Sequence, residues 1–423
     1  MGSCPTVDSM SEPLWDFMPP PSSDLQDREV SRRGSRLSNN RIALILSGSI
    51  AAYRSPDLIR DLRREGAEVQ VFATADALRY VAREALEWTS LNPVLTESSP
   101  NAEHLSDNSP FSAYLVVPAT YNLLNKFAWG IADDLPTALL ASALGRAERA
   151  KTPILVVPTM HGSMHNQILQ ESLRRLHDYG VTVVPPRQEN GKNNLPDNEF
   201  LVGHLIRSLS TGTLKGHQLM ITGGPTPVWV DHVRLFTNRF TGALAIEIAK
   251  QAWVEGAAIQ LILGQGSLPA PSYLPHQRVV DFSSYREKVL SGLDDGAFGT
   301  AIFSAAVADY QPSQVYPGKL PSGQQLTLSF EQTPKVIREV RAAHPKLKMV
   351  TFKYEENRTH EELMTIARER SKEYQLVVAN RGEEFIEYGD QVAWLVEENK
   401  PEEQVVGKPA IAKAVLDRVA SWL

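Results

Sequence analysis

Short apolar runs alternate with longer amphipathic stretches from Arg41 to the end of the chain. In the first half, the runs "IALILSG", "AEVQVFAT", "AYLVVPAT" and "TPILVVPT" have the length and the β-branched content of buried strands. Stretches such as "SPDLIRDLRREG" lie between them and repeat their apolar residues at helical spacing. Strands that alternate with helices usually pair in parallel and carry helices on both faces. The pattern therefore predicts a doubly wound domain.

The same alternation starts again at "HQLMITGGPT" and continues through "IQLILGQG", "TAIFSAAVADY", "LKMVTFKY", "YQLVVAN" and "QVAWLVEE" to a terminal helix. Ser, Thr and Gly interrupt it around "LIRSLSTGTLKGHQ". The expected fold class is α/β, with two tandem doubly wound (Rossmann-like or flavodoxin-like) three-layer domains and mainly parallel sheets. We expect the first domain at 39–205, a linker at 206–216 and the second domain at 217–423.

Residues 1–38 show no apolar period and are rich in Ser, Pro, Asp and Arg, so a disordered tail is expected there. The net charge of -6 gives no general attraction for nucleic acid. The single cysteine, Cys4, excludes a disulfide within one chain. No apolar run approaches the roughly 18 residues that a membrane span needs. We expect a cytoplasmic protein whose partners are small molecules, not nucleic acid or membrane.

Three loops follow apolar runs of the first half, the position at which open α/β sheets bind ligands. In "SGSIAAYRSPD", Gly48 allows close backbone approach, and Ser47 and Ser49 offer hydroxyls to a phosphate. The other two loops are "PATYNLLNKFAWGIADDLPT" and "PTMHGSMHNQ". Each loop alone is a weak signal, because a Ser-Gly loop is an ordinary tight turn and a Met pair is usually core packing.

The order and spacing of these loops resemble the homo-oligomeric flavin-containing cysteine decarboxylases, over about residues 41–190. The resemblance implies a homo-oligomer and an FMN cofactor in the first domain. It also implies a catalytic role for His104, which stands fourteen residues before Pro118, the separation at which that family keeps its catalytic histidine. The cofactor-binding residues implied are Gly48, Ser49, Ser47, Pro118, Thr120, Asn122, Met160 and Met164.

Two departures from this family concern the substrate. His161 stands where the family has an asparagine that orients the substrate carboxylate. The region "RQENGKNNLPDNEF" has no cysteine, although the coenzyme A branch of the family has a proton-donating one there. We therefore expect flavin binding with impaired decarboxylation. His161 and His165 have the spacing of a metal-binding pair, but a third ligand is missing and no metal is predicted there.

In the second half, "MITGGPTPVWVDHVRLFTNRFTG" passes from a strand through Gly223 and Gly224, which let the backbone approach a ligand. The full Gly-x-Gly-x-x-Gly of a dinucleotide-binding dehydrogenase is missing. Asp309 ends the apolar run "FSAAVADY", where a Mg²⁺ ion bound to phosphates can be held. Lys319 follows on a polar loop.

This half resembles phosphopantothenate–cysteine ligase over residues 217–423. The family pattern of Gly-Pro-Thr, Asp-x-Val-Arg and an Asn four residues later fits Gly224, Asp231, Arg234 and Asn238. Lys319 falls ten residues after Asp309, where the family has its flap lysine. The order of the two halves is that of the bifunctional coenzyme A biosynthesis flavoproteins.

The resemblance implies two chemical steps. The carboxylate of 4'-phosphopantothenate attacks the α-phosphorus of a nucleoside triphosphate, and the cysteine amine then displaces the nucleotide. Lys319 would neutralise charge on the α-phosphate, and Asp309 would orient the nucleotide or its Mg²⁺. Arg234 and Asn238 would hold the acyl intermediate. Further nucleotide-binding residues implied are Gly223, Gly224, Phe352 and Lys335.

The nucleotide stays open between CTP and ATP, although the segments that carry Lys335 and Lys353 look like the eukaryotic, ATP-using form. Ala243 occupies a position that is basic in the family, with Arg239 close by in sequence. Three hypotheses follow: an active ligase with an impaired flavoprotein domain, an active bifunctional enzyme, or a repurposed module without catalysis. The first predicts that Lys319, Asp309, Arg234 and Asn238 converge on one triphosphate.

Overall fold

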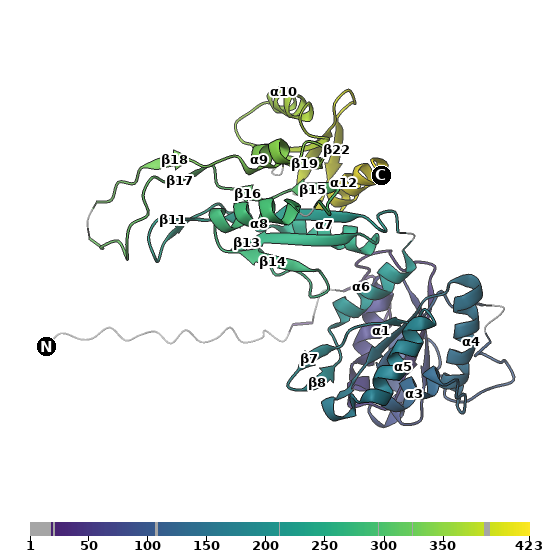
Figure 1. The fold of residues 1–423 in the computed structure, drawn as a ribbon. Helices are drawn as coiled ribbons and strands as arrows, with labels where there is room; N and C mark the ends of the chain where they lie inside the picture. Colours follow the sequence, from purple (N-terminus) through teal and green to yellow (C-terminus); the bar gives the residue numbers. More distant parts are fainter. Residues whose placement is uncertain are drawn as a thin grey trace.

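The computed structural model describes residues 18–19, 22–105, 109–210, 212–294, 296–323, 325–384 and 390–423. Two α/β units follow each other along these residues (Figure 1). Both central sheets are mainly parallel, which confirms the expected fold class. None of the helices described is long and apolar enough to cross a membrane.

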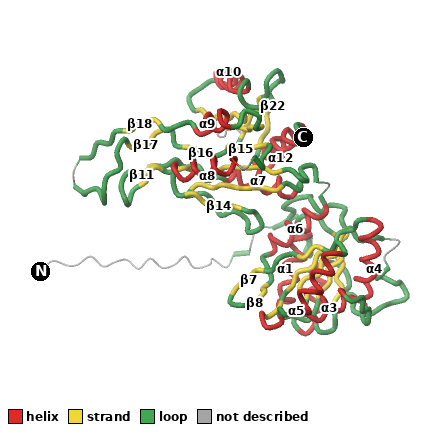
Figure 2. The backbone as a smooth tube through the Cα atoms, viewed as in Figure 1, coloured by secondary structure: helices red, strands yellow, loops and turns green. Residues whose placement is uncertain are grey.

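The first unit is built on a five-stranded sheet of order β2-β1-β3-β4-β6, with all pairings parallel. All seven residues of β3 are buried. Helices cover both faces (Figure 2), which explains why the strands read as continuous apolar runs. The strands are β1 (Arg41–Leu46), β2 (Glu68–Ala73), β3 (Ala113–Ala119), β4 (Ile154–Pro158) and β6 (Thr182–Val183). The helices are α1 (Ser55–Arg64), α2 (Arg83–Ser90), α3 (Tyr121–Ala128), α4 (Leu135–Ala150), α5 (Gln167–Asp178) and α6 (Asn198–Leu209), with short 3-10 turns η1 (Ile50–Arg54), η2 (Ala77–Arg79) and η3 (Gly162–Met164).

A small sheet lies beside this unit, with the order β5-β8-β7 and antiparallel pairing. Its strands are β5 (Met160–His161), β7 (Arg187–Glu189) and β8 (Lys192–Asn194). It joins the loop after β4 to a hairpin that comes later in the chain.

The second unit has an eight-stranded sheet of order β14-β13-β9-β15-β19-β20-β21-β22, in which the last two pairings are antiparallel. The strands are β9 (Gln218–Gly223), β13 (Ala258–Gly264), β14 (His276–Val279), β15 (Thr300–Phe303), β19 (Lys348–Glu355), β20 (Leu376–Arg381), β21 (Val392–Val396) and β22 (Glu403–Val406). The helices are α7 (Ala243–Val254), α8 (Phe282–Asp294), α9 (Val336–Ala343), α10 (His360–Ser371) and α12 (Lys408–Ser421).

Short strands form an extension of the second unit, which we call the arm (Figure 1). The arm contains β11 (Val228–Trp229) paired with β12 (Leu235–Phe236), and β17 (Tyr310–Pro312) paired with β18 (Phe330–Gln332). A further short pair, β10 (Pro225–Thr226) and β16 (Ala306–Val307), lies at its base. Large apolar side chains on the arm are exposed to solvent, namely Val233, Phe236, Tyr310, Val315, Tyr316, Leu326, Leu328 and Phe330.

Part of the segment expected as a tail lies against the first unit. Leu37 is fully buried, and the backbone N–H of Arg33 donates to Arg64 O at 2.9 Å. Arg28 donates to the carbonyl of Trp88 at the end of α2. Arginines that bind the carbonyls at helix C-termini order this polar segment without a core of its own. The remainder of the tail, residues 1–17, 20 and 21, lies outside the described residues, and Cys4 with it.

Candidate functional site

The three loops of the first unit meet at the carboxyl ends of β1, β3 and β4. Ser47 Oγ donates to Pro118 O at 2.7 Å and accepts from the Thr120 N–H at 2.9 Å. The Thr159 N–H donates to Ala119 O at 3.1 Å and brings the loop after β4 alongside. Ser47 therefore uses its hydroxyl proton in a hydrogen bond within the protein, and it connects the loop after β1 to the loop after β3.

Two helical N-termini open beside these contacts. Ser49 caps η1 by accepting from the Ala51 N–H, and Thr120 caps α3 by accepting from the Leu123 N–H. Gly48 packs so closely that an added Cβ would lie 2.5 Å from Asp76 Cβ. Such a turn presents backbone N–H groups to an anion without a side chain in the way.

The loop after β4 is held beneath the β7–β8 hairpin. The Gly162 N–H donates to Gly191 O at 3.1 Å, and an added Cβ on Gly162 would lie 2.3 Å from that oxygen. Met160 is buried in β5, whereas Met164 is exposed; Asn122, on α3 after β3, is exposed as well. The predicted cofactor residues of this loop thus divide between the interior and the surface.

The two histidines of this loop share one tautomer. His161 Nδ1 accepts from the Ser163 N–H at 3.2 Å, and His165 Nδ1 pairs with Asn193 Nδ2 at 3.1 Å. A ring nitrogen that accepts leaves the proton of a neutral imidazole on Nε2. In the described residues, no group of three or more His, Cys, Asp and Glu is placed to hold a metal.

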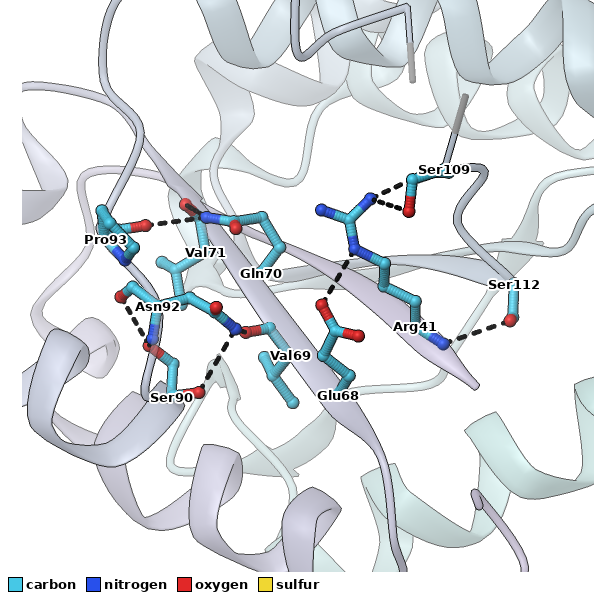
Figure 3. A network of polar contacts seen from close by, with 10 residues as sticks. All are labelled: Arg41, Glu68, Val69, Gln70, Val71, Ser90, Asn92, Pro93, Ser109 and Ser112. Carbon is cyan, nitrogen blue, oxygen red and sulfur yellow. Dashed lines mark hydrogen bonds and ion pairs between the residues drawn. The ribbon is translucent and has the colours of Figure 1, made fainter. Parts of the chain in front are cut away.

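A polar network (Figure 3) holds Asn92 and Ser109, which precede and follow His104 in the sequence. Before it, Asn92 Nδ2 donates to Val69 O at 2.9 Å; after it, Arg41 donates to Ser109 O at 2.7 Å. His104 Nδ1 is buried and has no hydrogen-bond partner within the described ranges. Among the residues that the structure describes, no hydrogen bond or ion pair joins His104 to any of the three loops.

The second unit has a cavity of about 1570 Å³ at the carboxyl ends of β9, β15, β19 and β20. Typical pockets for one small ligand measure roughly 300–1,000 Å³, so this cavity has room for more than one substrate. Five residues that the sequence predicted line it, namely Gly224, Asn238, Asp309, Lys335 and Phe352.

Glycines at the end of β9 bring the backbone close to α7. A Cβ added to Gly223 would lie 2.2 Å from the Cβ of Ala245 in α7. A Cβ added to Gly224 would lie 1.7 Å from Ser267 Oγ. Helix α7 starts after Gly242, which has a φ of 72° and provides no side-chain cap. The first N–H groups of α7 thus stay available at the cavity wall, an arrangement suited to a phosphate.

Asn238 and Asp309 occupy this cavity with defined partners. Asn238 Nδ2 donates to Ala306 O at 2.8 Å, which fixes the loop after β15. The carboxylate of Asp309 forms an ion pair with Lys335, and both side chains are more than half exposed. A carboxylate and an ammonium therefore face solvent at the mouth of the cavity.

Arg234 and Lys319 lie elsewhere, around the fully buried carboxylate of Asp231. Arg234 forms an ion pair with Asp231 and donates to Leu320 O at 3.3 Å. The Leu320 N–H donates to Asp231 Oδ2 at 2.8 Å. Burial raises the pKa of Asp231, but hydrogen bonds from the N–H groups of Leu320, Val233 and Arg234 outweigh it and hold the pKa well below its usual range.

The four side chains predicted to converge are therefore brought together as two pairs. Asn238 and Asp309 line the cavity. Arg234 lies in the arm between β11 and β12, where it contacts the carbonyl of Leu320, the residue after Lys319; neither Arg234 nor Lys319 lines the cavity. Lys319 is exposed.

Several cationic residues of the cavity were not predicted as site residues. Arg381 follows the matched "VVAN" run, and Lys408 starts α12 after Gly407, a glycine with a φ of 89°. The glycine before a helix was the signal available for Lys408. Arg239 and Lys353, noted only as sequence variants, also line the cavity.

Two family models match the chain. The Flavoprotein model covers residues 30–210, and the model of the DNA/pantothenate metabolism flavoprotein C-terminal domain covers residues 214–423.

Curated relatives match most of the chain. The coenzyme A biosynthesis bifunctional protein CoaBC of Thermococcus kodakarensis is 33% identical over 356 residues, which are 82% of this chain and 87% of the relative. The protein of the same name from Methanocaldococcus jannaschii is 28% identical over 392 residues, 90% of this chain and 94% of the relative. Among solved structures, the DNA/pantothenate metabolism flavoprotein of Streptococcus pneumoniae is 23% identical with a TM-score of 0.45, and the match covers 49% of this chain and 100% of that one.

Proposed function

The chain belongs to the family of coenzyme A biosynthesis bifunctional proteins, and on this premise we propose that its second half ligates 4'-phosphopantothenate and cysteine while its first half binds FMN. One observation carries the ligase proposal: the glycine turn, the N-terminus of α7, Asn238, Asp309 and Lys335 share one large cavity. A nucleoside triphosphate, a phosphorylated acid and an amine can meet there.

In the ligase half, the substrate carboxylate attacks the α-phosphorus and pyrophosphate leaves. The cysteine amine then attacks the acyl carbon, loses a proton and expels the nucleoside monophosphate. The free N–H groups of α7 would hold phosphate oxygens, and Lys335 with Lys353 would offset the charge that develops on them.

Mg²⁺ fits at Asp309 as a companion of the nucleotide. A single carboxylate with phosphate oxygens is a usual ligand set for this ion. Asp309 is exposed at the cavity mouth and would have to exchange its partner Lys335 for the ion.

We also propose a homo-oligomer. Arg234 and Lys319 stand outside the cavity of their own chain, on an arm whose apolar side chains are exposed. A second copy is the partner that fits this arm, because it would cover the apolar side chains of both arms by the same contact. Such pairing, or closure of the arm, would bring these cations to a triphosphate.

In the first half, FMN would be held by the turn at Gly48 and the N-termini capped by Ser49 and Thr120. When bound, FMN supplies reversible two-electron chemistry. His161 in the substrate loop and the missing cysteine favour impaired decarboxylation. The names of the relatives, which include "bifunctional", favour the alternative of an active decarboxylase.

The ligase proposal is tested by mixing the purified protein with 4'-phosphopantothenate, cysteine and either ATP or CTP. Pyrophosphate release with one of them is expected; no release with either nucleotide would contradict the ligase proposal. Release of carbon dioxide from 4'-phosphopantothenoylcysteine decides between the two readings of the first half. A yellow protein with flavin absorbance supports the FMN site.

A further inference from the structure

Helix α6 belongs to the chain of the first unit but packs against both units. Asn198 Nδ2 at its start donates to Asp61 Oδ2 of α1 at 2.8 Å. Leu201, Leu205 and Ile206 are buried in a hydrophobic cluster that also contains residues of α1, α7 and both central sheets. One continuous apolar core therefore runs from the first unit into the second.

Aromatic rings connect α6 to the second unit. Phe200 and His204 stack with ring centroids 4.4 Å apart, His204 meets Trp253 of α7 at 4.9 Å, and Trp253 meets Tyr273 at 4.7 Å. A Cβ on Gly203 would lie 3.3 Å from the Tyr273 ring, so glycine keeps this contact close. Ring contacts of this kind add to the free energy of simple burial.

Arg207 of α6 caps the C-terminus of α7. Its guanidinium donates to Ala257 O at 3.0 Å, to Gly256 O at 3.1 Å and to Trp253 O. It also lies over the Trp253 ring, 4.7 Å from the centroid. A cation at the end of a helix satisfies carbonyls that the helix itself leaves unpaired.

The connection between the units is held along its length. Glu255 accepts hydrogen bonds from Ser210 Oγ at 3.3 Å and Thr213 Oγ1 at 3.1 Å, and the Leu214 N–H donates to its backbone carbonyl at 3.0 Å. Only residue 211 of this connection lies outside the described ranges. A linker fixed at these points does not act as a flexible tether.

The N-terminal segment makes a further link across the units. Arg36 forms an ion pair with Glu247 of α7 at 3.7 Å, and the neighbouring Leu37 is fully buried in the shared cluster. The segment thus contacts α1 through its backbone and α7 through this side chain.

We propose that these contacts, centred on Arg207 and Trp253, join the two halves into one rigid body that unfolds as a single cooperative unit. A substitution that destabilises one half then lowers the unfolding midpoint of both halves, because neither half unfolds without losing the joint. This inference does not depend on the reaction that either half catalyses.

The test uses urea unfolding of the full chain, followed by hydrogen exchange and mass spectrometry of peptides from β3 and from β15. A single midpoint is expected for both peptides in the wild type. Arg341→Ala is a destabilising change confined to the second half, because this arginine binds Pro345 O and Leu347 O and lies over Tyr374. It should lower the midpoints of both peptides together, by about 0.5 M urea.

Arg207→Ala removes the same kind of side chain from the joint and should separate the two midpoints. If Arg207→Ala prevents folding, Glu255→Gln replaces it in the test. Glu255→Gln weakens only the linker contacts and should separate the two midpoints by a smaller amount. Two midpoints in the wild type, or an Arg341→Ala change that moves the β15 peptide alone, would overturn the proposal.

Discussion

Lys335 and Asp309 form an ion pair at the mouth of the cavity in the second half. The sequence predicts both as nucleotide-site residues, the lysine for the nucleotide and the aspartate for the nucleotide or Mg²⁺. Ion pairs between exposed side chains contribute little free energy, about 0–1 kcal/mol. A triphosphate that carries a cation can therefore separate the pair and bind both partners.

Lys335→Ala should lower kcat/KM for pyrophosphate release about 100-fold, because a fixed cation beside the developing phosphate charge is lost. The measurement is a coupled pyrophosphate assay with ATP and with CTP. The matched control is Lys413→Ala, which removes a lysine from a similar exposed pair with Asp417 on α12. If Lys335→Ala keeps the wild-type kcat/KM, the nucleotide does not bind beside Lys335.

Lys319→Ala should abolish nucleotidyl transfer and leave the flavin absorbance unchanged. Lys319 is exposed and outside the cavity of its own chain, so this outcome requires that the arm close or that a second copy supply it. The assay is pyrophosphate release, with Lys346→Ala as the control for an exposed lysine of the same unit. Full turnover in Lys319→Ala would show that this lysine takes no part.

The central sheets were predictable because their strands are covered on both faces. Strand β1 begins at Arg41, where the apolar pattern begins, and β3 is an uninterrupted buried run. The small sheet of β5, β7 and β8 gave no such signal, since it is short, largely polar and formed by residues distant in sequence. Helix α6 continues to Leu209, into the range 206–216 where Ser, Thr and Gly predicted a linker, because Arg207 and its neighbours pack on α7.

The cavity was predictable in part. The motif spacing shared with the ligase family located Asn238 and Asp309, and both line the cavity. The placement of Arg234 could not be predicted from the sequence. It depends on a hydrogen bond from the Leu320 N–H to Asp231, a contact across 89 residues. A pattern along the chain carries no information on such a contact, so the separation of the four residues into two pairs appears only in three dimensions.

His161→Asn should raise the release of carbon dioxide from 4'-phosphopantothenoylcysteine, by about tenfold if orientation of the carboxylate limits the reaction. The reason is that His161 Nδ1 is occupied by the Ser163 N–H, so the ring offers one donor where an amide offers two. His177→Asn on α5 is the control, an exposed histidine away from the loop. Rapid release by the wild type, with no gain in His161→Asn, would favour the active bifunctional reading.

The pH dependence of stability should reveal the histidine in the joint between the halves. Burial, with a smaller contribution from Arg207, lowers the pKa of His204 to about 4 from an ordinary value of 6.5. Other charged groups around the joint include Asp197, Glu199, Glu247, Lys250 and Glu255, with Arg36 from the N-terminal segment.

Well above pH 6.5 His204 is neutral in the folded and the unfolded chain and adds no pH dependence. Between pH 6.5 and 4 the unfolded chain binds a proton that the folded chain does not, so the free energy of unfolding falls as the pH falls. The loss should reach about 2 kcal/mol at pH 5 and about 3 kcal/mol at pH 4.

His204→Phe keeps a ring in the stack but cannot titrate, so its urea midpoint should fall less than that of the wild type between pH 7.5 and pH 5. His276→Phe is the control: its Nδ1 lies 2.8 Å from Leu274 O, as that of His204 lies 3.3 Å from Phe200 O, but His276 is exposed. Its pH dependence should match the wild type. Equal slopes in His204→Phe and the wild type would mean that His204 does not stay neutral in the folded joint.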